Sequence, residues 1–209
     1  MSDASSKPKA KKSSFSSFSL MQAYKQLNLT KLTSWTIQTK PLAPSEFFEQ
    51  RLERLKRFDL RIYEESRKLL IDAICEEGLQ GFTRLKIWKG ASLETNTVAG
   101  YVDYVVTDDR DYLEAPFLCI VEAKRDDFEQ GLAQCLIEMQ ACQQLNQHIG
   151  RSIEVFGIVT NGEAWKFYKL TTSNAVYETI LYSLQDISTL LGVLQFILEQ
   201  CERNLLQTA

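Results

Sequence analysis

The middle of the chain alternates between short apolar runs and polar loops. GYVDYVV at 100–106 is followed by the polar stretch TDDRDYLEA and then by PFLCIVEAK at 116–124. Two apolar runs around a turn-rich spacer predict an antiparallel β-hairpin. In the second run both alternating faces stay apolar until the end, which indicates a central strand covered on both sides.

Apolar positions at helical spacing surround this hairpin. They predict helices that begin at Ser45 and Phe58, a helix capped by Asp126 and Asp127, and a last helix capped by Asp186. Alternation predicts further strands over 82–88, 154–160, 161–170 and 175–183, with a polar loop over 90–97. The resulting order, α, β, β, β, α, β, β, β, α, predicts an α/β fold with a mixed sheet flanked by helices.

Composition divides the chain into three parts. Residues 1–19 are rich in Ser and Lys and contain almost no large aliphatic side chains, so they are predicted to be a disordered basic tail. Organelle transit peptides share this composition, and that interpretation stays open. Residues 20–44 are predicted to be an arm packed on the domain rather than a full-length helix. Residues 45–209 are predicted to form a single domain, a length that can bury a sizeable core.

The net charge of -3 conceals an asymmetry. Residues 1–45 carry a net charge of +6, and the remaining residues carry -9. Phosphate binding is largely electrostatic, so this balance, taken alone, argues against a nucleic-acid function. A basic tail and a bound cation would offset the repulsion locally.

The five cysteines are odd in number, and most of them fall in apolar periodic segments. We expect reduced, buried thiols of a cytoplasmic protein rather than a disulfide framework. No run of about 18 apolar residues occurs, so neither a transmembrane helix nor a membrane partner is expected. A single histidine, His148, argues against a histidine-rich metal site or a Ser–His–Asp triad.

Three charged residues meet at the end of the predicted hairpin. Glu122 and Lys124 lie two residues apart where the second apolar run ends, and Asp103 lies in the partner run. Burying a charge is costly unless it is paired or bound to a metal, so the group needs an explanation. One explanation is structural: Glu122 and Lys124 form an ion pair at a strand end, and Asp103 is an ordinary edge acid. On periodicity alone, Glu64 and Glu65 are solvated acids of the preceding helix.

A second explanation comes from the combination of residues. A helix acid, an Asp on a strand, E-x-K ending the next apolar strand and a Gln-bearing helix together resemble the restriction-endonuclease-like, or PD-(D/E)xK, nuclease superfamily. The αβββαβ core of that superfamily is similar to the order predicted over residues 58–160, and extra strands and a helix follow it here. The resemblance assigns the superfamily's site to Asp103, Glu122, Lys124, the helix acid Glu65 and the helix glutamine Gln134.

The resemblance is most specific to the N-terminal nuclease domain of type I restriction enzyme motor subunits. Glu65-Ser66-Arg67 followed by LLIDAI, and TNGEAWKFY at 160–168, are similar to motifs of that group. The chain departs from the pattern at Val102, where the superfamily name has Pro, and after Gln134, where CLIEM follows without the usual Tyr. It also carries no helicase motor, so the function of a whole restriction enzyme does not carry over.

The resemblance implies a metal-dependent nuclease that hydrolyses phosphodiester bonds of DNA, with an RNA substrate and a homodimer left open. Asp103 and Glu122, the main-chain carbonyl of Ala123 and Glu65 would hold Mg²⁺ or Mn²⁺, because hard cations prefer oxygen ligands. Lys124 would orient the attacking water or stabilise the developing charge. Two alternatives stay open: a catalytically inactive nuclease fold that binds nucleic acid or protein, and a structural or regulatory scaffold.

Overall fold

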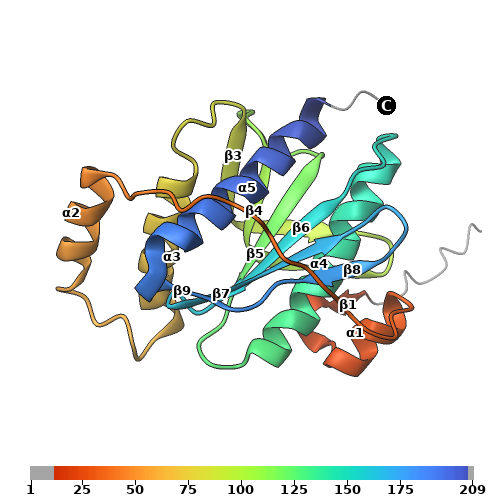
Figure 1. Cartoon of the computed structure of the whole chain (residues 1–209). Helices are drawn as coiled ribbons and strands as arrows, with labels where there is room; N and C mark the ends of the chain where they lie inside the picture. The colour runs from red at the N-terminus through yellow and green to blue at the C-terminus, as the bar shows by residue number, and fades with distance from the viewer. Residues whose placement is uncertain (1–11, 207–209) are drawn as a thin grey trace, which may run out of the picture.

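The computed structural model describes residues 12–206. The first half of the chain forms β1 (Ser13–Ser14), the 3₁₀ turn η1 (Phe15–Ser17), α1 (Leu20–Gln26), β2 (Thr33–Ser34), α2 (Glu46–Leu55), α3 (Glu64–Gly78), β3 (Leu85–Glu94) and β4 (Val98–Asp108). The second half forms β5 (Phe117–Ala123), α4 (Phe128–His148), β6 (Val155–Thr160), β7 (Ala164–Leu170), β8 (Val176–Glu178), β9 (Tyr182–Ser183), the 3₁₀ turn η2 (Leu184–Asp186) and α5 (Ile187–Leu206). From α3 to α5 the predicted order of elements is observed, with the last predicted strand divided into β8 and β9 (Figure 1).

One mixed sheet runs through the molecule. Its strands follow the order β3-β4-β5-β6-β7-β8-β2, and β1 and β9 add short pairings to β4 and β7. β5 and β6 are parallel, whereas β3–β4, β4–β5 and β6–β7 are antiparallel. Every residue of β5 is buried, which confirms the predicted central strand. Gly162, at φ +87, makes the tight turn between β6 and β7 that Asn161-Gly162 predicts.

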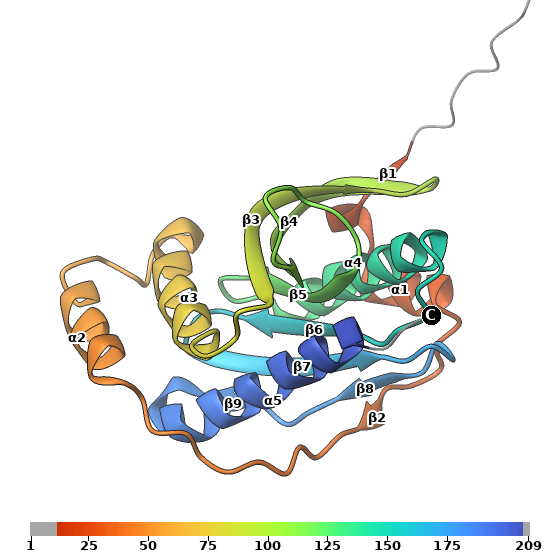
Figure 2. The ribbon, with the colours of Figure 1, turned by 90° about the horizontal axis from the view of Figure 1, so that it is seen from above.

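Helices cover both faces of the sheet (Figure 2). α3 and α5 pack on one face, where Ile71, Ile74 and Leu194 belong to one buried apolar cluster. α1 and α4 pack on the other face, where Ala23 and Leu136 belong to a second cluster. The molecule is therefore an α/β domain with a mixed sheet between helical layers. The middle of β4 contacts α3, and the end of β5 contacts α4.

The N-terminal segment is more ordered than its composition indicates. Residues 1–19 are predicted to be a disordered tail. Residues 1–11 lie outside the described residues, and for residues 12–19 the prediction is wrong. Ser13 N donates to the main-chain oxygen of Thr97 (3.0 Å) as β1 pairs with β4. Phe15 is 1% exposed because its ring packs directly over a glycine of β4. One buried aromatic ring thus orders a segment that is otherwise polar.

The arm over 20–44 packs on the domain, as predicted. α1 lies against α4, and β2 pairs with β8. Its helix has seven residues, in line with the expectation that no full-length helix forms here.

Two predicted boundaries are wrong. The helix expected from Phe58 begins at Glu64, and Phe58 and Ile62 are exposed on the preceding loop. The polar loop expected over 90–97 is largely strand, because Ala91 and Leu93 continue the alternation of β3 and are buried. In both places tertiary packing, which local spacing does not contain, sets the boundary.

Within residues 12–206, no helix combines the length and apolarity needed to cross a bilayer. All five cysteines are free and buried, as expected.

Candidate functional site

β4 and β5 separate at the point where the charged residues lie. Their ladder pairs Tyr104 with Val121, and beyond this pair β4 leaves β5 and runs beside β1. Asp103 and Glu122 are the next residues on the two strands, so they face each other across the start of the gap. In Figure 2, β3 and β4 curve away from the rest of the sheet. The sheet therefore opens where β5 ends, after Ala123, while β4 continues.

The Asp103 carboxylate closes the start of this gap. Its Oδ2 accepts a hydrogen bond from the main-chain nitrogen of Ala123 (2.9 Å), in place of a strand partner. Its Oδ1 forms an ion pair with Lys68 Nζ on α3 (2.9 Å). The Asp103 side chain is 19% exposed and that of Lys68 is 12% exposed, so solvent screens this pair less than a surface pair.

Glu122 is fully buried at the end of β5. Its Oε1 forms an ion pair with Lys124 Nζ (2.7 Å), and its Oε2 accepts from Gln134 Nε2 on α4 (3.0 Å). Burial, followed by the negative charge of Asp103, raises the pKa of Glu122 to about 7. Burial acts to lower the pKa of Lys124, but the charge and hydrogen bond of Glu122, together with the charges of Glu64 and Asp103, raise that pKa above its ordinary value. Lys124 is therefore an ammonium donor at neutral pH and not a base.

Both carboxylates are held by the same kind of contacts. One oxygen of each accepts from a neutral N–H group, and the other oxygen faces a lysine. Oxygen donors of this type fit a hard divalent cation. The two lysine-facing oxygens, Asp103 Oδ1 and Glu122 Oε1, are the ones available to such an ion. Within residues 12–206, no three acidic, histidine or cysteine side chains form a ready metal cluster. An ion would therefore have to compete with Lys68 or Lys124 for a carboxylate oxygen.

The helix acids lie differently from the expectation for Glu65. The Glu65 side chain is 80% exposed and pairs with Lys68 (2.6 Å), so it connects to Asp103 through that lysine. Glu64 is partly buried, and its charge contributes to raising the pKa of Glu122 and of Lys124. Glu64 lies two helical turns before the fully buried Ile71 and thus on the inward face of α3. The structure turns Glu64, rather than Glu65, toward the carboxylates.

Sequence reasoning missed two residues of this site. Lys68 lies one turn after Glu64 on α3 and reaches Asp103. Glu138 lies one turn after Gln134 on α4, is 0% exposed, and accepts from Gln134 Nε2 (2.9 Å). The available signal for Glu138 was an acid inside the apolar stripe of a helix.

The motifs Glu65-Ser66-Arg67 and TNGEAWKFY (160–168) make structural contacts near the site. Arg67 Nη1 donates to the main-chain oxygen of Arg125 (2.7 Å) and Nη2 to that of Arg61 (2.9 Å), which ties α3 to the segment after Lys124. Trp165 is fully buried, and its indole nitrogen donates to the oxygen of Gly162 (2.9 Å). These contacts stabilise the end of the sheet that carries the carboxylates.

Stability should depend on pH through Glu122. Its pKa rises from 4.5 to about 7 on folding, so its contribution is fully present below pH 4.5 and is lost as pH rises through 7. Without metal, the free energy of unfolding should fall by about 3 kcal/mol over this interval relative to Glu122→Gln. Denaturant titrations of both proteins measure the difference. Glu129→Gln, at the exposed start of α4, should retain the wild-type slope, and an identical slope in Glu122→Gln would contradict the assignment.

Lys68→Met tests the competition between a lysine and a cation. Without its ammonium partner, the Asp103 carboxylate is left shielded and unpaired, so we expect a loss of about 1–3 kcal/mol in metal-free protein. The rise in melting temperature on adding Mn²⁺ should be larger than in wild type, because Asp103 Oδ1 is no longer occupied. Lys89→Met, which removes the ion pair with Asp72 on α3 (2.7 Å), is the matched control. An equal metal response in wild type and Lys68→Met would show that no ion binds at Asp103.

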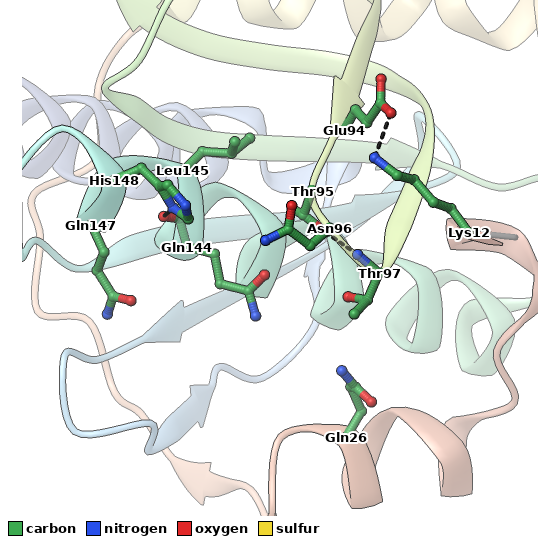
Figure 3. Close-up of a pocket in the computed structure, with 10 residues that line it drawn as sticks. All are labelled: Lys12, Gln26, Glu94, Thr95, Asn96, Thr97, Gln144, Leu145, Gln147 and His148. Atoms are coloured by element: carbon green, nitrogen blue, oxygen red, sulfur yellow. Dashed lines mark hydrogen bonds and ion pairs between the residues drawn. The ribbon is translucent and has the colours of Figure 1, made fainter. Parts of the chain in front are cut away.

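A large cavity lies away from this cluster. It has a volume of about 940 Å³ and lies between the β3–β4 turn, the N-terminal segment and the end of α4. Figure 3 shows its polar lining, which includes Lys12, Asn96 and His148. The single histidine is exposed there, with Nδ1 2.9 Å from the main-chain oxygen of Gln144. No acid of the candidate site lines this cavity, so the cavity and the cluster of charged residues lie in different parts of the molecule.

The chain matches no family model. A stretch of 50 residues is 44% identical to Crinkler effector protein 5 of Phytophthora infestans. That stretch is 24% of this chain and 13% of the Phytophthora protein, so the chain spans a small part of the length of this relative. The similarity is local and leaves most of the chain unmatched.

Proposed function

We propose that the protein is a metal-dependent nuclease with a restriction-endonuclease-like fold that hydrolyses phosphodiester bonds of DNA. The observation that carries the proposal is the convergence of Asp103, Glu122 and Lys124 where β4 and β5 separate, with Gln134 contacting both Glu122 and Lys124. An isolated E-x-K occurs by chance in many chains. An E-x-K beside a strand Asp and a helix Gln, all in contact, is a far more selective arrangement.

The topology supports the same fold. α3, β3, β4, β5, α4 and β6 follow one another in the order of the superfamily core. β3, β4 and β5 form an antiparallel meander, and α4 connects β5 to the parallel strand β6. Asp103 in β4 contacts α3 through Lys68, and Glu122 at the end of β5 contacts α4 through Gln134.

Each residue has a role that follows from its environment. Asp103 and Glu122 would hold the cation through the oxygens that now face lysines, and the charge of Glu64 would add to theirs. When bound, Mg²⁺ or Mn²⁺ neutralises phosphate charge and makes water a better nucleophile. Lys124, an ammonium at neutral pH, donates to the attacking water or to the phosphate oxygen on which charge develops. Gln134 orients Lys124 by accepting from its Nζ (3.2 Å).

The acidic character of the chain agrees with a requirement for metal. Residues 46–209 carry a net charge of -9, which opposes DNA binding. A divalent ion at the carboxylates supplies positive charge at the point where a phosphate must approach. Binding of DNA is therefore expected to be much weaker in chelator than with Mg²⁺.

A nuclease assay tests the proposal. The protein is incubated with end-labelled duplex, single-stranded and branched DNA and with RNA, in Mg²⁺, Mn²⁺ or chelator. We expect metal-dependent cleavage of DNA that is lost in Glu122→Gln and retained in Glu178→Gln, which removes the carboxylate of a Lys–Glu ion pair between β7 and β8. Absence of cleavage on every substrate with either metal would refute a nuclease function.

A second candidate function is a nuclease fold that binds nucleic acid without cutting it. The observation that favours it is the pairing of both carboxylates with lysines, Lys68 and Lys124, which neutralise the site without metal. This function predicts DNA binding that is unchanged by chelator and a melting temperature that is indifferent to Mn²⁺.

A further inference from the structure

Glu138 is a buried acid that the proposed chemistry does not use. It is 0% exposed on α4, beside the apolar residues Cys135, Met139 and Cys142. Its Oε2 is buried and makes no hydrogen bond within residues 12–206. Burial, followed by the negative charge of Glu122, raises its pKa well above the ordinary value. An apolar residue would fit this helix face with less loss of hydration, so burial of an acid here requires an explanation.

The contacts of Gln134 suggest one. Its amide nitrogen donates to Glu122 Oε2 (3.0 Å) and to Glu138 Oε1 (2.9 Å), which uses both N–H groups. Its amide oxygen accepts from Lys124 Nζ (3.2 Å). A flipped amide would place oxygen against two carboxyl oxygens and nitrogen against an ammonium. The three contacts together therefore select one orientation of the amide.

We propose that Glu138 is a positioning residue that fixes the Gln134 amide so that it holds Glu122 and Lys124 in the geometry of the reaction. This inference rests on the proposed nuclease function. Glu138 lies four residues after Gln134 on α4, so the helix itself sets the distance between them. Without Glu138, one amide hydrogen of Gln134 has no acceptor, and the side chain is free to rotate away from Lys124.

The consequence reaches the ammonium of Lys124. Lys124 has two acceptors, Glu122 Oε1 (2.7 Å) and Gln134 Oε1 (3.2 Å). If the Gln134 contact is lost, Lys124 keeps its ion pair with Glu122 but loses the second acceptor that fixes the orientation of its ammonium group. The turnover rate should then fall while the affinity for DNA stays the same, because Glu138 touches neither solvent nor substrate.

Three variants of α4 test the inference. Glu138→Leu removes the acceptor and buries an apolar side chain instead. Glu138→Gln keeps an oxygen that accepts from Gln134. Gln143→Leu, at a buried polar position farther along α4 whose amide donates to the oxygen of Thr171 (2.9 Å), is the matched control for loss of a buried polar group.

The readouts are kcat and KM with Mg²⁺, and the melting temperature. Loss of a residue that orients a catalytic group costs about tenfold to a hundredfold in activity. We expect Glu138→Leu to lose kcat to this extent with KM unchanged and with a melting temperature at or above wild type. Glu138→Gln should recover most of that kcat. Gln143→Leu should show the reverse pattern, a lower melting temperature with kcat unchanged.

A double substitution tests whether Glu138 acts through Gln134. Gln134→Ala combined with Glu138→Leu should be no slower than Gln134→Ala alone. Multiplied losses, or wild-type kcat in Glu138→Leu, would overturn the proposal.

Failure of the inference can be distinguished from failure of the nuclease function. Hydrogen exchange at the Gln134 side-chain amide, followed by NMR in the metal-free protein, needs no activity. Exchange should be slow in wild type and in Glu138→Gln, and faster in Glu138→Leu. An inactive wild type with this exchange pattern would refute the nuclease and leave Glu138 as the residue that fixes Gln134. Equal exchange in all three proteins would overturn the positioning role even if the enzyme is active.

Discussion

Lys124→Ala is expected to lower the rate of phosphodiester cleavage by about a thousandfold, because the developing charge loses a positioned ammonium. The effect should lie in kcat at saturating Mg²⁺, since Lys124 is partly buried and is held by Glu122 and Gln134. Binding of metal should persist, because the carboxylates of Asp103 and Glu122 are intact and one competing ammonium has been removed. Single-turnover cleavage and melting curves with Mn²⁺ measure the two properties separately.

The control for Lys124→Ala is Lys166→Ala. Lys166 also pairs with a glutamate on a neighbouring strand, Glu178 at 2.6 Å, but it lies on β7 outside the site. Its removal should leave cleavage unchanged. Because alanine also removes most of the side-chain volume, Lys124→Met serves as a second variant that retains the bulk of the side chain. Wild-type cleavage in either Lys124 variant would exclude a catalytic role for this lysine.

The elements that the sequence predicts correctly are those with local signals. β5 is apolar on both faces, Asp127 caps α4 by accepting from Gln130 N (2.8 Å), and Asn161-Gly162 forms a tight turn. The three charged residues could be grouped for the same reason. Alternation along the two strands of one hairpin is enough to expect Asp103, Glu122 and Lys124 at the same end of that hairpin.

The remaining parts of the site depend on contacts between distant segments. Glu64 and Glu65 are adjacent in sequence, and the rotation of α3, set by buried residues such as Ile71, decides which of them faces inward. In the sequence Lys68 looks like any helix lysine, and only the packing of α3 against β4 brings it to Asp103. In the sequence Glu138 is an acid among the apolar residues of a helix, and only the structure shows its contact with Gln134. Local spacing carries no information about any of these approaches.

The exposed loop before α3 illustrates the opposite error. Phe58 and Ile62 have helical spacing with the core residues of α3, yet both are exposed on a loop. Phe15 lies in a polar segment of low complexity, yet it is buried against β4. Periodicity reports which residues share a face, but it does not report whether another segment covers that face.

The second large effect concerns metal and stability. At a Mn²⁺ concentration of about one hundred times the dissociation constant, the wild-type fold should gain about 2.7 kcal/mol, or roughly 5–10 °C in melting temperature. Asp103→Asn and Glu122→Gln each remove a ligand and should show little gain. Asp72→Asn is the control, because Asp72 also pairs with a lysine of its own, Lys89, but lies outside the site. It should retain the wild-type response.

The two ligand variants should differ from each other without metal. Asp103→Asn loses the ion pair with Lys68 at 2.9 Å, so it should be less stable than wild type. Glu122→Gln removes a fully buried acid whose pKa is raised to about 7, so above pH 7 it should be more stable than wild type. The wild-type gain from Mn²⁺ should also grow as pH rises through 7, because the cation competes with the proton on Glu122. A gain that is independent of pH would place the ion away from Glu122, and no gain at all would favour the non-catalytic binding module.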